Sequence, residues 1–262
     1  MQGGPERPKD AGRSAEELPE AVRDIVQAVE RAEKGDILFM HDIVGKRDAE
    51  RSAHLSQQRH EAAGYVEGVK RALEHDDSVK VLGWEELETY GMREGSQNSR
   101  EVLRAIAEQN PGKKIVLDFD PLQDKSIAPR WNQLEDSMAG TMHRTGPRAE
   151  GWLRDWLVRE QKNQHQEGDP TKEEMEAGCE QALSAMRRIS SDLKKGLHRA
   201  GGNSPLALAL IVFAAKGTFE NDAFGMFDRP HRTHEAVEFI KVDGATVEVS
   251  FAGAKFTRTL VG

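Results

Sequence analysis

Short, continuous apolar runs alternate with amphipathic helical segments along this chain, and this alternation constrains the fold more than any other feature. Residues 37–40 read Ile-Leu-Phe-Met, and further apolar runs occur within residues 79–82 and 114–120. Runs of this length between polar flanks are typical of buried parallel strands. Because strands that alternate with helices form parallel sheets, we expect a three-layer α/β fold with a mostly parallel sheet and helices on both faces.

The segments between the apolar runs have apolar residues at helical spacing, so they are predicted to be helices. A Ser or Thr followed three residues later by Glu forms a capping box, and this pattern begins two of these segments, at Ser14 and at Thr171. Trp152, Trp156 and Leu157 are spaced like one packed face of a further helix. Apart from that segment, the predicted helices cover residues 14–35, 62–73, 100–109 and 171–193.

The last third of the chain carries two further patterns. Residues 206–213 are almost entirely apolar and follow Pro205, which predicts a central strand buried on both faces. Residues 237–242 and 245–251 alternate in polarity around Asp243-Gly244, the preferred two-residue turn of a hairpin. The chain is therefore expected to close with a C-terminal β-hairpin.

The chain shows neither an internal repeat nor a linker, so its 262 residues are expected to form one domain. Residues 1–13 are rich in Gly, Pro and charge and are predicted to be a mobile tail. The single domain is predicted to span residues 14–262, with residues 14–35 as an added N-terminal helix.

Composition excludes several classes of function. A net charge of -8 without clustered Lys and Arg argues against a nucleic-acid partner. The longest apolar run, residues 205–215, is too short to span a bilayer, and the N-terminus is charged rather than signal-like. The single cysteine, Cys179, has no disulfide partner and is expected in the core. We therefore expect a cytoplasmic protein without a membrane partner.

Few short motifs with known chemistry occur. His231 and His234 have HxxH spacing, but no third ligand supports a metal site. The chain contains no complete Walker loop, no GxGxxG after a strand and no GxSxG elbow. The segment Gly45-Lys46-Arg47 follows the first predicted strand, where a basic loop can bind an anion. No metal and no cofactor are expected.

Three landmarks of the sequence resemble the histidine phosphatase (phosphoglycerate mutase-like) superfamily. They are the strand at residues 37–40, the phrase His-Leu-Ser-Gln-Gln-Arg-His-Glu-Ala-Ala at residues 54–63, and residues 209–220. In that family the first strand ends in Arg-His-Gly, a Leu-Thr-Glu-Xaa-Gly phrase starts the first helix, and a late strand ends in Ser-His-Gly-Gly. With the closing hairpin, the resemblance extends from Ile37 to Leu260 and implies a histidine-phosphatase-like fold.

The resemblance implies a nucleophilic histidine at the end of the first strand. An ungapped alignment places His41 on the family's arginine and Asp42 on its nucleophile, whereas a shift by one residue places His41 on the nucleophile. Either alignment lacks a pocket arginine. Asp42 adds a negative charge where a phosphate would bind, which is unfavourable in a desolvated site.

The remaining family positions are partly retained. The resemblance implies that Arg100 and Lys216 bind phosphate and that Asp124 is the catalytic acid. It also places Ala215 on the family's second histidine, and alanine can neither donate a hydrogen bond nor carry a charge. Two exposed arginines at helical spacing, Arg100 and Arg104, are an equally good explanation of that segment.

These residues predict a pseudophosphatase that has lost most phosphomonoesterase activity and keeps a binding or regulatory role. One alternative is an active, divergent phosphomonoesterase with His41 as nucleophile, Arg100 and Lys216 as phosphate clamps and Asp124 as acid. Another alternative is a non-catalytic α/β interaction module. The expected partner is a phosphorylated small molecule or protein.

Overall fold

The structure is a computed structural model. It describes residues 20–40, 66–93, 97–141, 144, 147–193, 197–200, 204–227, 239–251 and 253–260. The predicted tail at residues 1–13 and the family phrase at residues 54–63 lie outside the described residues.

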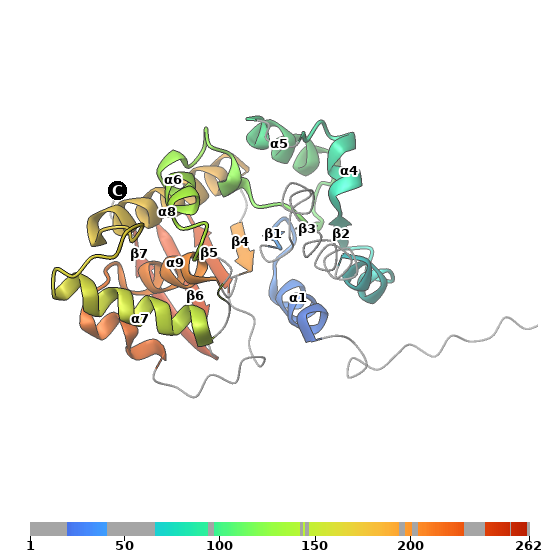
Figure 1. Cartoon of the computed structure of the whole chain (residues 1–262). Helices are drawn as coiled ribbons and strands as arrows, with labels where there is room; N and C mark the ends of the chain where they lie inside the picture. The colour runs from blue at the N-terminus through green and yellow to red at the C-terminus, as the bar shows by residue number, and fades with distance from the viewer. Residues whose placement is uncertain are drawn as a thin grey trace, which may run out of the picture.

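The described strands form one seven-stranded sheet in the order β2-β3-β1-β4-β5-β6-β7 (Figure 1). Strand β1 lies inside this sheet and pairs in parallel with β3 on one side and with β4 on the other. The strands are β1 (Ile37–Phe39), β2 (Val79–Leu82), β3 (Lys114–Leu117), β4 (Leu197–Ala200), β5 (Phe239–Asp243), β6 (Thr246–Phe251) and β7 (Ala254–Thr259).

Helices cover both faces of the sheet, as the sequence predicts. On β1, Ile37 and Phe39 pack into the larger core with the helices α4 to α9, whereas Leu38 and Met40 pack into the smaller core with α1 and the helical residues 66–73. The helices are α1 (Glu20–Arg31), α4 (Trp84–Thr89), α5 (Ser99–Gln109), α6 (Pro129–Ser137), α7 (Pro147–Gln161), α8 (Lys172–Leu193) and α9 (Pro205–Lys216). Short 3₁₀ helices occur at η2 (Pro121–Gln123) and η3 (Asn221–Phe227).

The sheet is mixed rather than mostly parallel. Strands β2, β3, β1 and β4 pair in parallel, but β5, β6 and β7 continue the sheet with antiparallel pairings. The predicted hairpin is confirmed, because Asp243 pairs with Thr246 across the turn. Strands β4 and β7 had no counterpart in the sequence prediction.

The predicted central strand at residues 206–213 is wrong, because these residues belong to helix α9. The Ser204 side chain accepts a hydrogen bond from the Ala207 N–H at the helix start, and Pro205 occupies the first turn. Gly217 ends the helix with a left-handed φ of 79°. All residues from Pro205 to Ala214 are buried, so the helix lacks the polar face that would reveal its period.

Two predicted helical features are confirmed. Helix α8 begins with the Thr171 capping box, in which the Glu174 N–H donates to Thr171 Oγ1 at 3.1 Å and the Thr171 N–H donates to Glu174 Oε2 at 2.8 Å. Cys179 is fully buried on this helix. On α7, Trp152 and Trp156 are buried and stack with ring centroids 6.4 Å apart, as a packed helix face requires.

The close approach of α6 and α8 gives a test of this packing. A Cβ atom added at Gly178 of α8 would lie 2.1 Å from Leu134 Cδ1 of α6. We expect Gly178→Ala to lower the free energy of unfolding by about 1 to 3 kcal/mol, because Leu134 is buried and must move. Urea unfolding measures the change.

Gly151 of α7 is the matched control, since a Cβ there meets no atom within 4 Å. Gly151→Ala should be neutral or stabilising by up to about 1 kcal/mol, as expected for alanine in a helix. Equal effects of the two substitutions would contradict the close α6–α8 contact.

Candidate functional site at the carboxyl ends of β1 and β3

The described helices that connect β1 to β2 and β3 to β4 pack on opposite faces of the sheet. After β1 the chain returns to β2 through the helical residues 66–73, which pack on the smaller core. After β3 it returns to β4 through α6, α7 and α8, which pack on the larger core. Adjacent strands with connections on opposite faces leave a crevice beyond their carboxyl ends, and ligands of open α/β sheets bind in such crevices. The carboxyl ends of β1 and β3 are therefore the candidate site.

Asp118 lies at this point of the sheet, directly after β3. Its backbone N–H still donates to the carbonyl of Leu82 on β2, at 3.1 Å. It continues the alternation of β3, which places its side chain on the same face as Val116. Burial raises the pKa of the Asp118 carboxyl from 3.8 to about 7. A carboxyl with this pKa can gain or lose a proton near neutral pH.

The predicted nucleophile positions His41 and Asp42 lie outside the described residues, as does the basic segment Gly45-Lys46-Arg47. Met40, the residue before His41, is described, and its N–H donates to the Leu117 carbonyl at 2.9 Å. The chain therefore still pairs with β3 immediately before His41, at the level where Asp118 begins. The choice between His41 and Asp42 as nucleophile stays a prediction.

Arg100 and Asp124 lie together at the first turn of α5. Asp124 is buried, and its carboxylate accepts hydrogen bonds from the Ser99 N–H at 3.3 Å and from the N–H and Oγ of Ser126 at 2.9 and 2.6 Å. Arg100 forms an ion pair with Asp192 of α8. These contacts give both side chains a structural role in joining α5 to the rest of the domain.

Ala215 and Lys216 lie at the opposite edge of the sheet. Helix α9 starts beyond the carboxyl end of β4 and runs back for about 18 Å. At its end, Arg258 near the end of the antiparallel strand β7 donates hydrogen bonds to the carbonyls of Phe213 and Ala214 at 3.1 and 3.0 Å. Lys216 is exposed there, with Nζ 5.7 Å from the ring centroid of Phe256. The structure thus does not bring Lys216 to the carboxyl ends of β1 and β3.

Asp118 was missed by sequence reasoning, although one signal pointed to it. It is the first acidic residue after a buried apolar run, where a parallel strand places its last side chain at the ligand-binding edge. What the sequence does not reveal is the burial of the carboxyl. That burial depends on the helices and strands that surround it.

Metal and membrane sites have no support in the described part of the chain. No group of three or more His, Cys, Asp or Glu side chains is arranged to hold a metal ion there. His231 and His234 lie outside the described residues. Among the described helices, none has the length and apolar character that a membrane crossing requires.

Comparison with protein-family models, curated proteins and solved structures finds no match to this chain.

The raised pKa of Asp118 makes stability depend on pH. Its carboxyl is protonated in the folded state up to a pKa of about 7, but ionises at a pKa near 3.8 when exposed. Stability is therefore lost as pH rises from about 4 to about 7, by about 2 to 4 kcal/mol in total. We expect Asp118→Asn to raise the free energy of unfolding at about pH 8, and to raise it less than half as much at about pH 5.

Urea unfolding at the two pH values tests this expectation. The control is Asp155→Asn, which removes an exposed carboxyl on α7 and should have a small effect at both pH values. A stability change for Asp118→Asn that does not vary with pH would contradict a half-buried carboxyl that holds its proton up to neutral pH.

Proposed function

We propose that this protein binds a phosphorylated small molecule at the carboxyl ends of β1 and β3, where the Asp118 carboxyl exchanges a proton with the ligand. The observation that carries the proposal is the position of Asp118 at the switch point of the sheet, with a pKa of about 7. A protonated carboxyl donates a hydrogen bond to a phosphate oxygen, whereas a carboxylate repels it.

The proposal that the ligand carries a phosphate group is based on the sequence that follows β1. Gly45-Lys46-Arg47 follows Met40 after a few residues and supplies the only paired Lys and Arg near the end of this strand in the sequence. Cationic side chains and backbone N–H groups after a central strand are a common way to hold a phosphate. These residues are the proposed source of positive charge, in place of Arg100 and Lys216.

Sulfate is the probe that tests this proposal, because it keeps its two negative charges across the pH range in which Asp118 titrates. We expect sulfate to bind about tenfold more weakly at pH 8.5 than at pH 5.5, since ionised Asp118 repels it. Asp118→Asn should remove the part of this pH dependence that Asp118 causes. Isothermal titration calorimetry measures both proteins at both pH values.

Two further variants locate the sulfate. Lys46→Ala/Arg47→Ala should weaken binding at least tenfold, because it removes the proposed positive charge. Lys216→Ala should leave binding unchanged, because Lys216 lies at the opposite edge of the sheet. Loss of binding in Lys216→Ala, with no effect of the Asp118 substitution, would overturn the proposal in favour of the clamp predicted from the family resemblance.

The second candidate function is an active phosphomonoesterase, and Asp118 is the observation that favours it. A carboxyl with a pKa near 7 is suited to general acid catalysis at neutral pH. In this reaction a His41 ring nitrogen bonds to phosphorus as the bond to the leaving oxygen breaks, and Asp118 gives that oxygen a proton. Water then hydrolyses the phosphohistidine, with Asp118 as base.

The pseudophosphatase prediction rested on Ala215 together with the broken Arg-His-Gly motif after β1. Ala215 lies at the edge of the sheet away from the proposed site, whereas the motif residues His41 and Asp42 lie outside the described residues. Turnover of p-nitrophenyl phosphate, together with mass-spectrometric trapping of phosphohistidine at His41, distinguishes the active enzyme from the binding protein. An active enzyme loses both signals in His41→Ala. A binding protein shows neither signal and still binds sulfate.

A further inference from the structure

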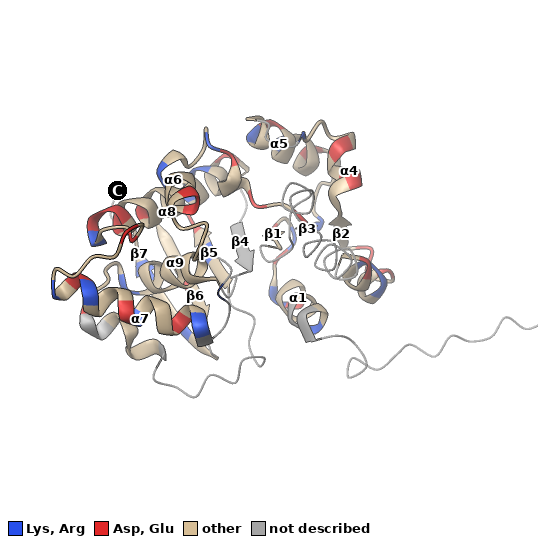
Figure 2. Ribbon diagram, in the orientation of Figure 1, with Lys and Arg blue, Asp and Glu red and all other residues tan. Residues whose placement is uncertain are grey.

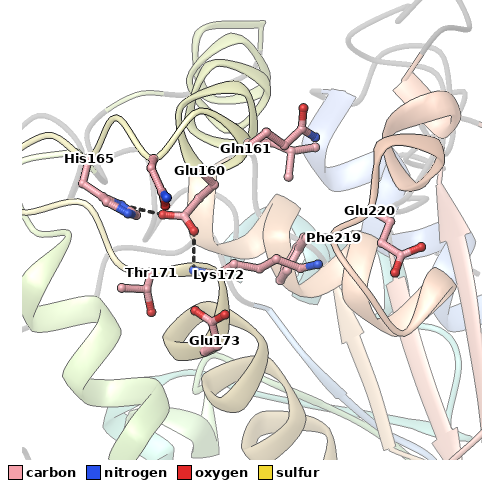
Figure 3. A pocket seen from close by; sticks show the side chains of 10 residues that line it. Glu160, Gln161, His165, Thr171, Lys172, Glu173, Phe219 and Glu220 are labelled. Carbon is pink, nitrogen blue, oxygen red and sulfur yellow. Dashed lines mark hydrogen bonds and ion pairs between the residues drawn. The ribbon is translucent and has the colours of Figure 1, made fainter.

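A hollow lies between the end of α7, the start of α8 and the segment that follows α9, away from the carboxyl end of β1 (Figure 3). Its volume is about 650 Å³, within the range typical of small-molecule sites. Leu157 and Phe219 supply apolar parts of the lining, and the other side chains around it are polar or charged. The sequence patterns predicted a helix start at Thr171 and packing at Leu157 in this lining, but no ligand site.

A buried carboxylate and an imidazole form one wall of the hollow. The Glu160 side chain is only 9% exposed, and its Oε1 lies 2.6 Å from His165 Nδ1. Its other oxygen accepts the Lys172 N–H at the start of α8, at 3.0 Å (Figure 3). A neutral His165 ring that carries its proton on Nδ1, toward Glu160, has Nε2 as a hydrogen-bond acceptor.

The loop that carries this wall is held by buried polar contacts. Arg159 Nε and Nη2 lie 2.9 and 2.7 Å from Asp169 Oδ2, in a pair that is largely shielded from water. Trp156 Nε1 donates to the Pro170 carbonyl at 2.8 Å. A wall fixed in this way needs little reordering when a ligand binds, so less binding energy is lost.

Two carboxylates in the hollow lack a counter-charge. Glu173 at the start of α8 and Glu220 beyond α9 come from different walls (Figure 3), both residues are exposed, and neither carboxylate has a hydrogen-bond or ion-pair partner among the described residues. The one Lys in the lining, Lys172, lies 3.8 Å from Glu176, so its charge is already shared with another carboxylate. The hollow therefore has an excess of negative charge and of hydrogen-bond acceptors.

A metal ion does not fit this arrangement, because the described side chains include no cluster of three or more metal-binding groups. We propose that the hollow binds a small organic cation that carries primary ammonium groups. Glu173 and Glu220 are its charge partners, and His165 Nε2 accepts a hydrogen bond from it. This site is independent of the one proposed at β1 and β3.

Cadaverine, a five-carbon diamine, is the probe, and 1,5-pentanediol is its neutral analogue of the same length. In calorimetry at low salt, the full chain should bind cadaverine and not the diol. Glu173→Gln/Glu220→Gln should weaken cadaverine binding about tenfold, because both charge partners are lost. The matched control is Glu30→Gln/Glu108→Gln, which removes two exposed carboxylates on α1 and α5 and should change binding less than twofold.

Equal loss of binding in the two double variants would overturn the proposal, because it would show attraction to the net charge of the chain alone. Absence of cadaverine binding to the wild-type chain, or equal binding of the diol, would overturn it as well. His165→Phe gives a further measurement, since it removes Nε2 and keeps a ring at the wall. It should weaken cadaverine binding while sulfate binding at β1 and β3 stays unchanged.

Discussion

The parallel pairing of β1 with two neighbours joins the two halves of this sheet. Ile37 pairs with Ile115 of β3 on one side and with Leu197 of β4 on the other, so in the described sheet β1 joins β2 and β3 to β4 and the antiparallel strands β5 to β7. The side chains of β1 also alternate between the two cores, so the strand is packed on both faces. Arg, Asp and Glu side chains are interspersed along α7, outside the apolar side chains that form these cores (Figure 2).

The central position of β1 also determines where a ligand can bind. The described part of its connection, residues 66–73, packs on one face, while the helices after β3 pack on the other, and adjacent strands connected in this way leave a crevice beyond their carboxyl ends. Asp118 follows β3 at this edge, and its partial burial disfavours the charged form of its carboxyl. The same packing that stabilises the sheet therefore produces a carboxyl that titrates near neutral pH. Stability is reduced where that carboxyl ionises, a cost that proteins commonly accept at functional sites.

Local patterns predicted the first three strands, the long helix α8 and the hairpin, because each has a period or a turn signal of its own. Helix α9 was predicted as a strand because it is buried on all sides and has no amphipathic period. The sequence does contain helix signals at both ends of this segment, with Ser204 and Pro205 at the start and Gly217 at the end, but the continuous apolar run outweighed them in the prediction. The site was predicted less well, because it depends on contacts between residues that are distant in the sequence. Asp192 pairs with Arg100 from 92 positions away. The partial burial that raises the pKa of Asp118 likewise exists only in the folded chain.

The central claim is that the carboxyl of Asp118 holds its proton up to neutral pH. A carbon-detected NMR titration of the aspartate side chains, with Asp118→Asn used to assign the resonance, measures that pKa directly in the full chain. The structure predicts a pKa of about 7 for Asp118, raised by burial from its ordinary value of 3.8. A pKa near the ordinary value would show that water reaches the carboxyl freely, and would contradict the proposed proton exchange with a ligand.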